Sequence, residues 1–218
     1  MNTFKPNLTS SMLLECALTI ASKDLNILDL GCGSGYVGLE VSKQIGLKNI
    51  SCSDLDPNSL ETVKKSFNDI DIDIDFRQGS LFEPWESNFF DLIIDDVSGV
   101  SKPIAQVSPW FNGVPCESGP CGTKLVNKVL IEAPNYLRKN GKLIFPIISL
   151  SKKGNIIDLA EKIYADVQLY KRKEWFMPES MKSYKELLDQ EKARGNISFE
   201  FKFGKVICFT EVYIASLK

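Results

Sequence analysis

The sequence predicts an α/β fold in which a mainly parallel sheet carries helices on both faces. First, short apolar runs typical of buried strands alternate with segments of helical apolar spacing through most of the chain. Second, a glycine-rich turn, Gly31–Gly35, lies between an apolar run and a helix-like segment. Third, polar residues follow several expected strands, whose carboxyl ends converge on one ligand-binding crevice in such sheets. These residues are Asp29, Asp54, Ser80, Asp95 and Asp96.

The 218 residues, 44% of them hydrophobic, suit a single domain over residues 1–218 with a sizeable core. A net charge of -2 does not favour a nucleic-acid partner, because dedicated binders usually carry a basic face. The sequence shows no cleavable signal pattern and no apolar run of membrane-spanning length, so we expect a soluble cytoplasmic protein without a membrane partner. Histidine is absent, which excludes Ser-His-Asp and Cys-His nucleophilic schemes and histidine metal sites.

Among the six cysteines, only Cys116 and Cys121 are close in sequence. Their spacing is not a common zinc half-site, so we expect no metal site. A disulfide between them is expected only in an oxidising compartment.

Helices and strands are expected in turn through the first part of the chain. Apolar residues at helical spacing predict a helix over 8–21, which Thr9 or Ser10 can cap. Asp56 followed by Pro57 is typical of a helix start. The other expected elements here are strands at 26–30 and 49–53 and a helix at 36–45.

The middle of the chain contains three expected strands and one long connection. Residues 70–76 alternate strictly between apolar and acidic, which predicts a strand with one solvated face near a sheet edge. Residues 90–94 form an apolar run apart from Asp91, which predicts a strand deep in the sheet, and 141–149 is expected to be another buried strand. The segment 97–122 is rich in Gly, Pro, Ser and Cys, and we expect an irregular binding loop or lid there.

The remaining elements are also expected from pattern. A helix over 123–137 should kink or end at Pro134. Two segments, 198–203 and 206–215, are joined tightly at Gly204 and Lys205, which predicts an antiparallel hairpin. The other elements are a helix at 155–165, a strand at 167–175 and a polar helix at 178–193.

The residues around the glycine-rich turn favour one kind of ligand over others. A phosphate site gains from keeping anions away from a helix start, whereas Asp29 lies two residues before the first glycine. A cationic or amine-bearing ligand suits this acid better. A Walker-type loop is excluded because no Gly-Lys-Ser/Thr follows the turn.

The segment Asp29-Leu30-Gly31-Cys32-Gly33-Ser34-Gly35 resembles motif I of the class I S-adenosylmethionine-dependent methyltransferases. This resemblance implies a Rossmann-like fold, with a mainly parallel seven-stranded sheet and a C-terminal antiparallel strand. It implies S-adenosyl-L-methionine as cofactor, with Asp54 bonding both ribose hydroxyls, for which a carboxylate offers two acceptor oxygens. The implied cofactor-binding residues are Asp29, Gly31, Cys32, Gly33 and Gly35 at the methionine part, Leu55 beside Asp54, Ser80 and Leu81 at the adenine, and Asp95.

Three further segments, 54–60, 78–84 and 90–94, are similar to the small-domain methyltransferases. That group includes the release-factor glutamine N5-methyltransferases and several RNA base N-methyltransferases. The resemblance runs from about Phe4 to Ile94 and resumes over 137–145.

The catalytic signature of that group, Asn-Pro-Pro-Tyr, is absent after the fourth strand, where this chain has Asp95-Asp96-Val97-Ser98-Gly99. A glutamine-amide or base-amine acceptor is therefore disfavoured. We expect Asp96, with Asp95, to be catalytic, because a carboxylate near the methyl group can take a proton or orient the acceptor. Two alternatives stay open: Asp95 forms a hydrogen bond with the cofactor or with the loop, and Asp96 caps a turn. A metal held by both acids is less favoured, because neighbouring strand residues face opposite sides.

The segment 97–122 and the start of the following helix also carry acceptor candidates. Trp110 and Phe111 are expected to stack on the acceptor, while Glu117 and Lys124 read its charge. The alternative is that the two aromatic rings anchor the segment to the core.

The sequence thus predicts methyl transfer from S-adenosyl-L-methionine to a small-molecule or peptide acceptor held beside Asp95 and Asp96. Two alternatives remain: an N-methyltransferase acting on RNA or a translation protein, and a cofactor-binding protein without catalysis.

Overall fold

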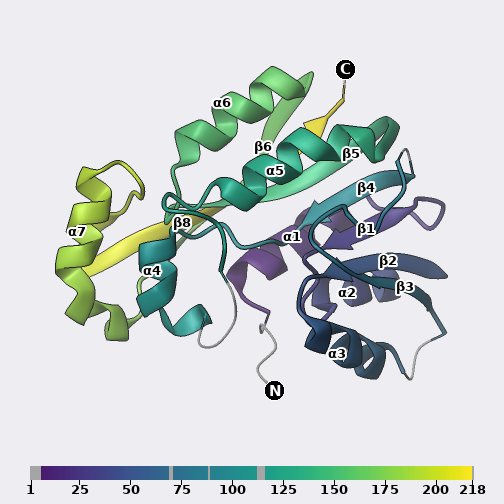
Figure 1. Cartoon of the computed structure of the whole chain (residues 1–218), viewed down its shortest axis with the longest axis horizontal. Helices are drawn as coiled ribbons and strands as arrows, with labels where there is room; N and C mark the ends of the chain where they lie inside the picture. The colour runs from purple at the N-terminus through teal and green to yellow at the C-terminus, as the bar shows by residue number, and fades with distance from the viewer. Residues whose placement is uncertain (1–5, 69–70, 88, 112–115, 218) are drawn as a thin grey trace.

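The computed structural model describes residues 6–68, 71–87, 89–111 and 116–217. Its centre is one mixed sheet with the strand order β3-β2-β1-β4-β5-β8-β6, and β7 pairs with β8 off this path (Figure 1). Strands β3 to β5 are parallel, and β8 runs antiparallel between β5 and β6. The mainly parallel sheet of seven strands is confirmed, with β7 as an eighth strand at the hairpin.

The elements of the described residues have the following bounds. The strands are β1 Ile27–Leu30, β2 Asn49–Asp54, β3 Asp73–Gln78, β4 Phe90–Asp95, β5 Leu137–Ile148, β6 Asp166–Phe176, β7 Glu200–Lys202 and β8 Lys205–Ser216. The α-helices are α1 Leu8–Leu18, α2 Tyr36–Ile45, α3 Pro57–Phe67, α4 Lys102–Val107, α5 Lys124–Glu132, α6 Lys153–Ile163 and α7 Lys185–Ala193. The short 3₁₀ helices are η1 Pro109–Phe111, η2 Ala133–Asn135 and η3 Glu179–Tyr184.

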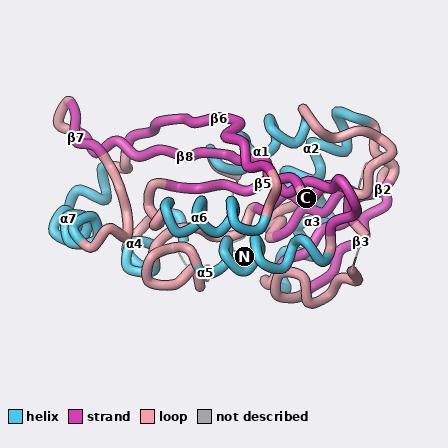
Figure 2. The backbone as a smooth tube through the Cα atoms, turned by 90° about the horizontal axis from the view of Figure 1, so that it is seen from above, coloured by secondary structure: helices cyan, strands magenta, loops and turns pink. Residues whose placement is uncertain are grey.

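Helices cover both faces of the sheet, as the alternation of elements predicts. One apolar cluster joins α1, α2 and α3 to residues of β1, β4 and β5 that include Ile94. A second cluster on the other face joins α5 and α6 to residues that include Ile93 (Figures 1 and 2). Neighbouring residues of β4 therefore enter opposite cores, which is why Leu92, Ile93 and Ile94 are all apolar.

The acidic alternation marks an edge strand, as expected. β3 begins at Asp73 rather than at residue 70, which lies outside the described residues, and extends to Gln78. Asp73 and Asp75 are exposed, while Phe76 packs against the cluster below α3. Arg77 pairs with Asp75 at 2.8 Å on the solvated face.

The expectation of an irregular segment over 97–122 is wrong in part. It contains α4 and η1, with Pro103 in the first turn of α4, where its missing N–H costs no hydrogen bond. Ile104 and Ala105 of α4 are buried in a third apolar cluster with residues near α7 that include Met181. This packing makes a helix out of a segment whose Gly and Pro content favours loops.

Several boundaries differ from their expected places. α5 ends at Glu132 and is followed by η2, whose residues include Pro134, so the expected helix end there is confirmed. β5 begins at Leu137, and its pairing with β4 shifts register near Asn140, which has a φ of 67°. The expected helix over 178–193 begins as η3 and becomes α-helical only at Lys185.

The predicted hairpin is confirmed by the pairing of β7 with β8, in which Lys202 lies opposite Lys205. Phe203 and Gly204 form its two-residue turn with φ angles of 54° and 70°. Positive φ at both central residues gives the turn twist that two-residue hairpins need.

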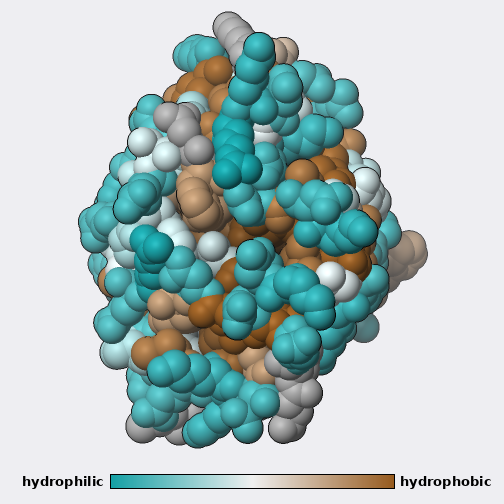
Figure 3. Space-filling view, turned by 90° about the vertical axis from the view of Figure 1, so that its right-hand side faces the viewer, coloured by the Kyte–Doolittle hydropathy of each residue, from teal (hydrophilic) through white to brown (hydrophobic). Residues whose placement is uncertain are grey.

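None of the helices formed by the described residues is long and apolar enough to cross a membrane. Hydrophilic side chains cover much of the side seen in Figure 3, with apolar patches between them.

Candidate active site

The turn between β1 and α2 is fastened to the neighbouring strand by its backbone. The N–H groups of Gly31 and Cys32 both donate to the carbonyl oxygen of Ser53, at 2.8 and 3.1 Å. Gly31 has a φ of 74°, and a Cβ there would lie 2.9 Å from the side chain of Val97. Glycine is therefore needed both for the turn and for the close approach of the segment that follows β4.

Asp29 supports this turn from inside the protein. The side chain is fully buried, and its Oδ2 accepts a hydrogen bond from the N–H of Gly38 at 2.8 Å. The pKa of Asp29 is raised to about 7. Burial and the nearby charge of Asp54 raise the pKa, and the hydrogen bond from the Gly38 N–H opposes them. Asp29 lies outside the lining of the cavity described below. It fixes the start of α2 against β1, and its direct contact with a ligand stays a prediction.

Asp54, the last residue of β2, presents its carboxylate at the mouth of the turn. Oδ2 accepts from the N–H of Gly33 and Oδ1 accepts from the N–H of Asp56, both at 2.8 Å. Burial raises the pKa of Asp54, whereas these two N–H groups and the Ser59 hydroxyl lower it. Each carboxylate oxygen can accept a second hydrogen bond, so two ligand hydroxyls fit this side chain. The helix α3 is capped by Asp56 and not by Asp54, because the side chain of Asp56 accepts from the N–H of Asn58.

Leu55, Ser80 and Leu81 lie beside Asp54 on the same cavity. The side chain of Leu55 is 60% exposed although it is apolar, and Leu81 has a φ of 52°. A leucine in the left-handed region is strained, and such strain is concentrated at functional sites. The three residues offer a mostly apolar surface that suits a flat ring.

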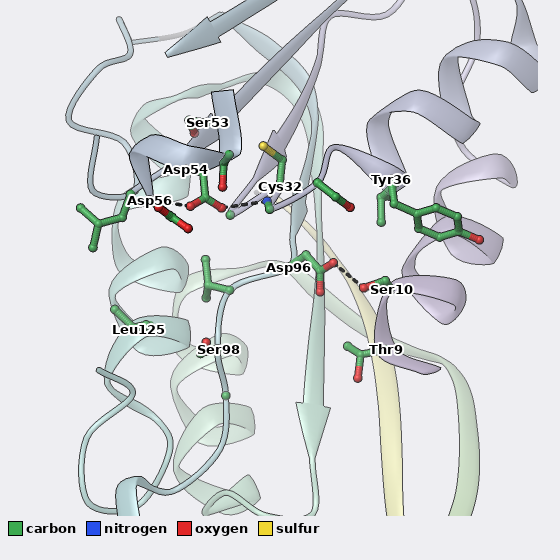
Figure 4. Close-up of a pocket in the computed structure, with 18 of the residues that line it drawn as sticks. Thr9, Ser10, Cys32, Tyr36, Ser53, Asp54, Asp56, Asp96, Ser98 and Leu125 are labelled. Carbon is green, nitrogen blue, oxygen red and sulfur yellow. Dashed lines mark hydrogen bonds between the residues drawn. The ribbon is translucent and has the colours of Figure 1, made fainter. Parts of the chain in front are cut away.

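The Gly31 turn, Asp54, Leu55, Ser80 and Leu81 open onto one cavity of about 740 Å³ at the carboxyl ends of β1, β2 and β4 (Figure 4). This volume lies in the range of small-molecule and cofactor sites. The first residues of α1 and residues of the segment after β4 complete its walls. Of the predicted cofactor-binding residues, Gly31, Cys32, Gly33, Asp54, Leu55, Ser80 and Leu81 line the cavity, while Asp29, Gly35 and Asp95 do not.

Asp95 and Asp96 at the end of β4 face opposite ways. Asp95 is fully buried, and its Oδ1 accepts a hydrogen bond from the N–H of Val97 at 3.1 Å. Burial raises the pKa of Asp95 to about 7, and the Val97 N–H lowers it. Asp95 therefore holds the backbone after β4 in place and does not line the cavity.

Asp96 lines the cavity, and its Oδ2 accepts a hydrogen bond from the hydroxyl of Ser10 at 2.8 Å (Figure 4). Its backbone N–H donates to the carbonyl of Leu30 at 3.0 Å. Burial raises the pKa of Asp96 well above its usual range, and the negative charges of Asp29, Asp95 and Asp54 raise it further. The Ser10 hydroxyl lowers it.

Ser10 is a site residue that the sequence pattern does not reveal. Asn7 caps α1 instead, because its Oδ1 accepts from the N–H groups of Thr9 and Ser10 at 2.7 and 3.2 Å. The Ser10 hydroxyl is then available to Asp96, 86 residues later in the chain. The one available signal is the asparagine before Leu8, which is as strong a cap as serine.

Of the predicted acceptor-binding residues, Trp110, Phe111 and Glu117 line the cavity, whereas Lys124 does not and its neighbour Leu125 does. The indole of Trp110 meets that of Trp175 edge-on, with ring centroids 5.7 Å apart. Both aromatic residues also pack against the cluster below α4. The two expectations for them, lining the site and anchoring the segment, are therefore compatible.

Cys116 and Cys121 are both free thiols. Cys116 lies 3.1 Å from the Ser118 hydroxyl, and Cys121 lies 3.3 Å from that of Thr123.

Comparisons with known proteins agree with this geometry. Residues 5–96 match the family model described as the methyltransferase small domain. A putative protein N5-glutamine methyltransferase from Methanocaldococcus jannaschii is 22% identical over 169 residues, which cover 78% of this chain and 84% of that protein. The chain is a methyltransferase, and its residues 5–96 are similar to the methyltransferase small domain.

Other relatives of this methyltransferase are longer. A ribosomal protein L11 methyltransferase from Thermosipho africanus is 26% identical, over 69% of this chain and 46% of that protein. A release factor glutamine methyltransferase from Geobacter sulfurreducens is 23% identical, over 64% of this chain and 51% of that protein. The matched part is about half the length of these two relatives.

Solved structures share the methyltransferase fold. The ribosomal protein L11 methylase from Lactobacillus delbrueckii subsp. bulgaricus has a TM-score of 0.58 at 16% identity, covering 98% of this chain and 81% of that one. M. jannaschii TYW2 in complex with AdoMet (S-adenosylmethionine) has a TM-score of 0.54 at 10% identity, covering 97% and 78%.

S-adenosyl-L-methionine is the cofactor of this methyltransferase, and the cavity fits it. Asp54 has room for two hydroxyl donors, and the crowded Gly31 turn leaves backbone at the cavity wall. The family match ends at residue 96, and the family's Asn-Pro-Pro-Tyr would continue from Asp96. The chain therefore lacks the Asn-Pro-Pro-Tyr sequence at the position where β4 ends.

Proposed function

We propose that this methyltransferase transfers the methyl group to a small-molecule or peptide acceptor whose nucleophilic atom lies beside Asp96. The observation that supports this most is that Asp96 lines the same cavity as Asp54 and the Gly31 turn. The cofactor supplies a methyl group on a positively charged sulfur. The protein's task is then to hold the acceptor in line with that methyl group, and such positioning can lower a barrier by about 7–11 kcal/mol.

The cofactor half is proposed to work as follows. The backbone from Gly31 to Gly33, with Cys32, contacts the methionine part, and Asp54 accepts hydrogen bonds from the ribose hydroxyls. Leu55, Ser80 and Leu81 enclose the adenine; all of these residues line the cavity. Asp29 and Gly35 contribute indirectly by fixing the start of α2, because neither of them lines it.

The acceptor half is proposed to consist of Asp96 with Trp110, Phe111 and Glu117. Asp96 orients the nucleophile or takes its proton, and Asp95 keeps the backbone after β4 in place through its hydrogen bond from Val97. The segment 97–122 acts as the acceptor-side lid of a single domain over 1–218. Lys124 is the first residue of α5 and lies outside the cavity lining, so it is not placed in the acceptor half.

The first test is calorimetric titration with S-adenosylmethionine and its demethylated product, followed by transfer of a labelled methyl group to fractions of a cell extract. We expect both ligands to bind, and label to enter the small-molecule or peptide fraction. Binding without label in any fraction supports the cofactor-binding alternative and contradicts the proposal.

A second candidate is N-methylation of RNA or of a translation protein. The names of the relatives favour it, because they include a release factor glutamine methyltransferase and ribosomal protein L11 methyltransferases. The replacement of Asn-Pro-Pro-Tyr from Asp96 onward argues against a planar amide or base as acceptor. Label in ribosomal protein or RNA, and none in the small-molecule fraction, decides for this candidate.

A further inference from the structure

The charged side chains that line the cavity are all acidic among the residues that the structure describes. Its described lining contains four acids and neither lysine nor arginine; the acids are Asp54, Asp56, Asp96 and Glu117. Asp54 and Asp56 lie at the end of β2 and serve the turn and the start of α3. Asp96 and Glu117 remain, and they lie in the acceptor half.

Among the described residues, Asp96 has a hydrogen-bond partner for one carboxylate oxygen only. Ser10 donates to Oδ2, and the described lining offers no cationic side chain for Oδ1. Three further acids, Asp29, Asp95 and Asp54, are near enough to disfavour its negative charge. A positive charge beside Oδ1 would therefore be attracted to several carboxylates at once in a partly desolvated place.

The wall next to these acids is aromatic and apolar. Trp110 is held edge-on by Trp175, and Phe111, Leu125 and Ile148 continue the lining. Aromatic faces attract cations, and tryptophan does so most strongly. Glu117 lies at the rim, 63% exposed, with Lys102 at 3.9 Å, and such an exposed pair holds its charges only weakly.

An ionised carboxylate only accepts hydrogen bonds, whereas the asparagine that the family has at this position both donates and accepts. A neutral amide needs both kinds of partner, but an amine or ammonium group needs acceptors. We propose that the acceptor is an amine that binds in its protonated form, carried on an apolar or aromatic group, with Asp96 Oδ1 as its partner. This inference rests on the proposed function and narrows its substrate class.

The transfer then balances as follows. The bound ammonium gives one proton to Asp96, and the nitrogen lone pair attacks the methyl carbon. A nitrogen–carbon bond forms while the carbon–sulfur bond breaks, and that electron pair stays on sulfur. The product leaves as a methylated ammonium ion, and Asp96 returns its proton to water. A raised pKa makes the Asp96 carboxylate a stronger base, which favours this proton transfer.

The test uses the full chain saturated with S-adenosylhomocysteine, which lacks the positive sulfur. Phenethylamine and its neutral counterpart 2-phenylethanol are titrated separately, and binding is followed by ligand-detected NMR. We expect the amine to bind at least about tenfold more tightly, from combined ion-pair and cation–π contacts. The variant Asp96→Asn should lose most of this preference, and Asp71→Asn, at an exposed site paired with Lys48, should keep it.

Glu117→Gln is the second variant, because its exposed side chain can be changed without disturbing the core. We expect it to reduce the preference by about two- to threefold, in line with a partly screened charge. Equal binding of the two probes by the wild-type protein, or no binding of the amine, overturns the inference. The acids of the cavity would then act only on the positive charge of the cofactor. An unchanged preference in both Asp96→Asn and Glu117→Gln overturns it too. Failure of S-adenosylhomocysteine to bind contradicts the proposed function instead.

Discussion

At the scale of single residues, the cofactor half depends on side chains that hold backbone in place. Gly31 allows the approach of Val97, Asp29 holds the N–H of Gly38, and Asp54 holds the N–H groups of Gly33 and Asp56. Asp54 is the one of these acids that also faces the cavity, so its loss should affect the ligand directly.

Asp54→Ala should weaken binding of S-adenosylhomocysteine by about 10- to 100-fold, since charge-assisted hydrogen bonds contribute roughly 1.5–3 kcal/mol each. Calorimetry measures the affinity, and circular dichroism checks that the fold is kept. Asp71→Asn is the control, because that carboxylate is fully exposed in an ion pair with Lys48 on the surface. Equal affinities for the Asp54→Ala and Asp71→Asn variants would show that Asp54 holds only the protein's own backbone.

Sequence reasoning reaches these residues unequally. The residues that follow strands, Asp54 and Asp96, could be placed at the cavity because parallel strands end at one edge. Ser10 could not, because its bond to Asp96 depends on how α1 crosses the sheet and on Asn7 taking the capping role. The opposite orientations of Asp95 and Asp96 were expected from strand geometry, but which of the two faces the cavity was not.

At the scale of elements, α4 is the part of the chain that composition describes least well. Its residues Ile104 and Ala105 are buried against the region of α7, a contact between segments distant in sequence. Local Gly and Pro content favours a loop, and tertiary packing overrides it. The strand β5 begins at Leu137 and not at the expected residue 141. The sequence pattern does not predict this start, because the pairing of β5 with β4 changes register near Asn140.

Ile104→Ala should lower the free energy of unfolding by about 2–5 kcal/mol, the usual range for emptying a buried isoleucine site. The matched control is Ile131→Ala, whose side chain is 56% exposed, and it should cost far less. Chemical denaturation monitored by circular dichroism measures both. Equal destabilisation of the two variants would contradict the burial of α4 and return the segment 97–122 to an irregular loop.

At the scale of the whole molecule, several acids gather below one cavity, and this makes stability depend on pH. Asp29 and Asp95 are buried, and their pKa values are raised to about 7. For a carboxyl group whose folded pKa is raised, stability is fully present below the unfolded value of about 4 and is lost as pH rises through the folded value. Two paired acids affect stability at lower pH, because their pKa values are lowered: Glu15, which is partly exposed, and Glu211, which is buried.

The cofactor-free protein should therefore have a lower unfolding free energy at pH 8 than at pH 5.5. Asp95→Asn removes one ionising group while its amide oxygen can still accept from Val97, so the variant should lose part of this decrease. Urea denaturation at the two pH values measures the effect. A wild-type protein that is more stable at pH 8 would contradict the buried positions of Asp29 and Asp95.

The order of strands follows from alternating elements and a glycine-rich turn, and these features predict the parallel core, the edge strand β3 and the final hairpin. The identity of the acceptor does not follow from them, because Asp96-Val97-Ser98-Gly99 stands where the small-domain methyltransferases have Asn-Pro-Pro-Tyr.

The most direct test of the central claim compares the wild-type protein with Asp96→Asn in two measurements on the same samples: affinity for S-adenosylmethionine and the rate of labelled methyl transfer to the fraction that accepts it. If Asp96 serves the acceptor, the rate should fall by about 100-fold or more while the affinity changes less than about threefold, as expected for loss of a positioned acid–base group. An unchanged rate, or a loss of affinity that accounts for the whole fall in rate, would contradict the claim.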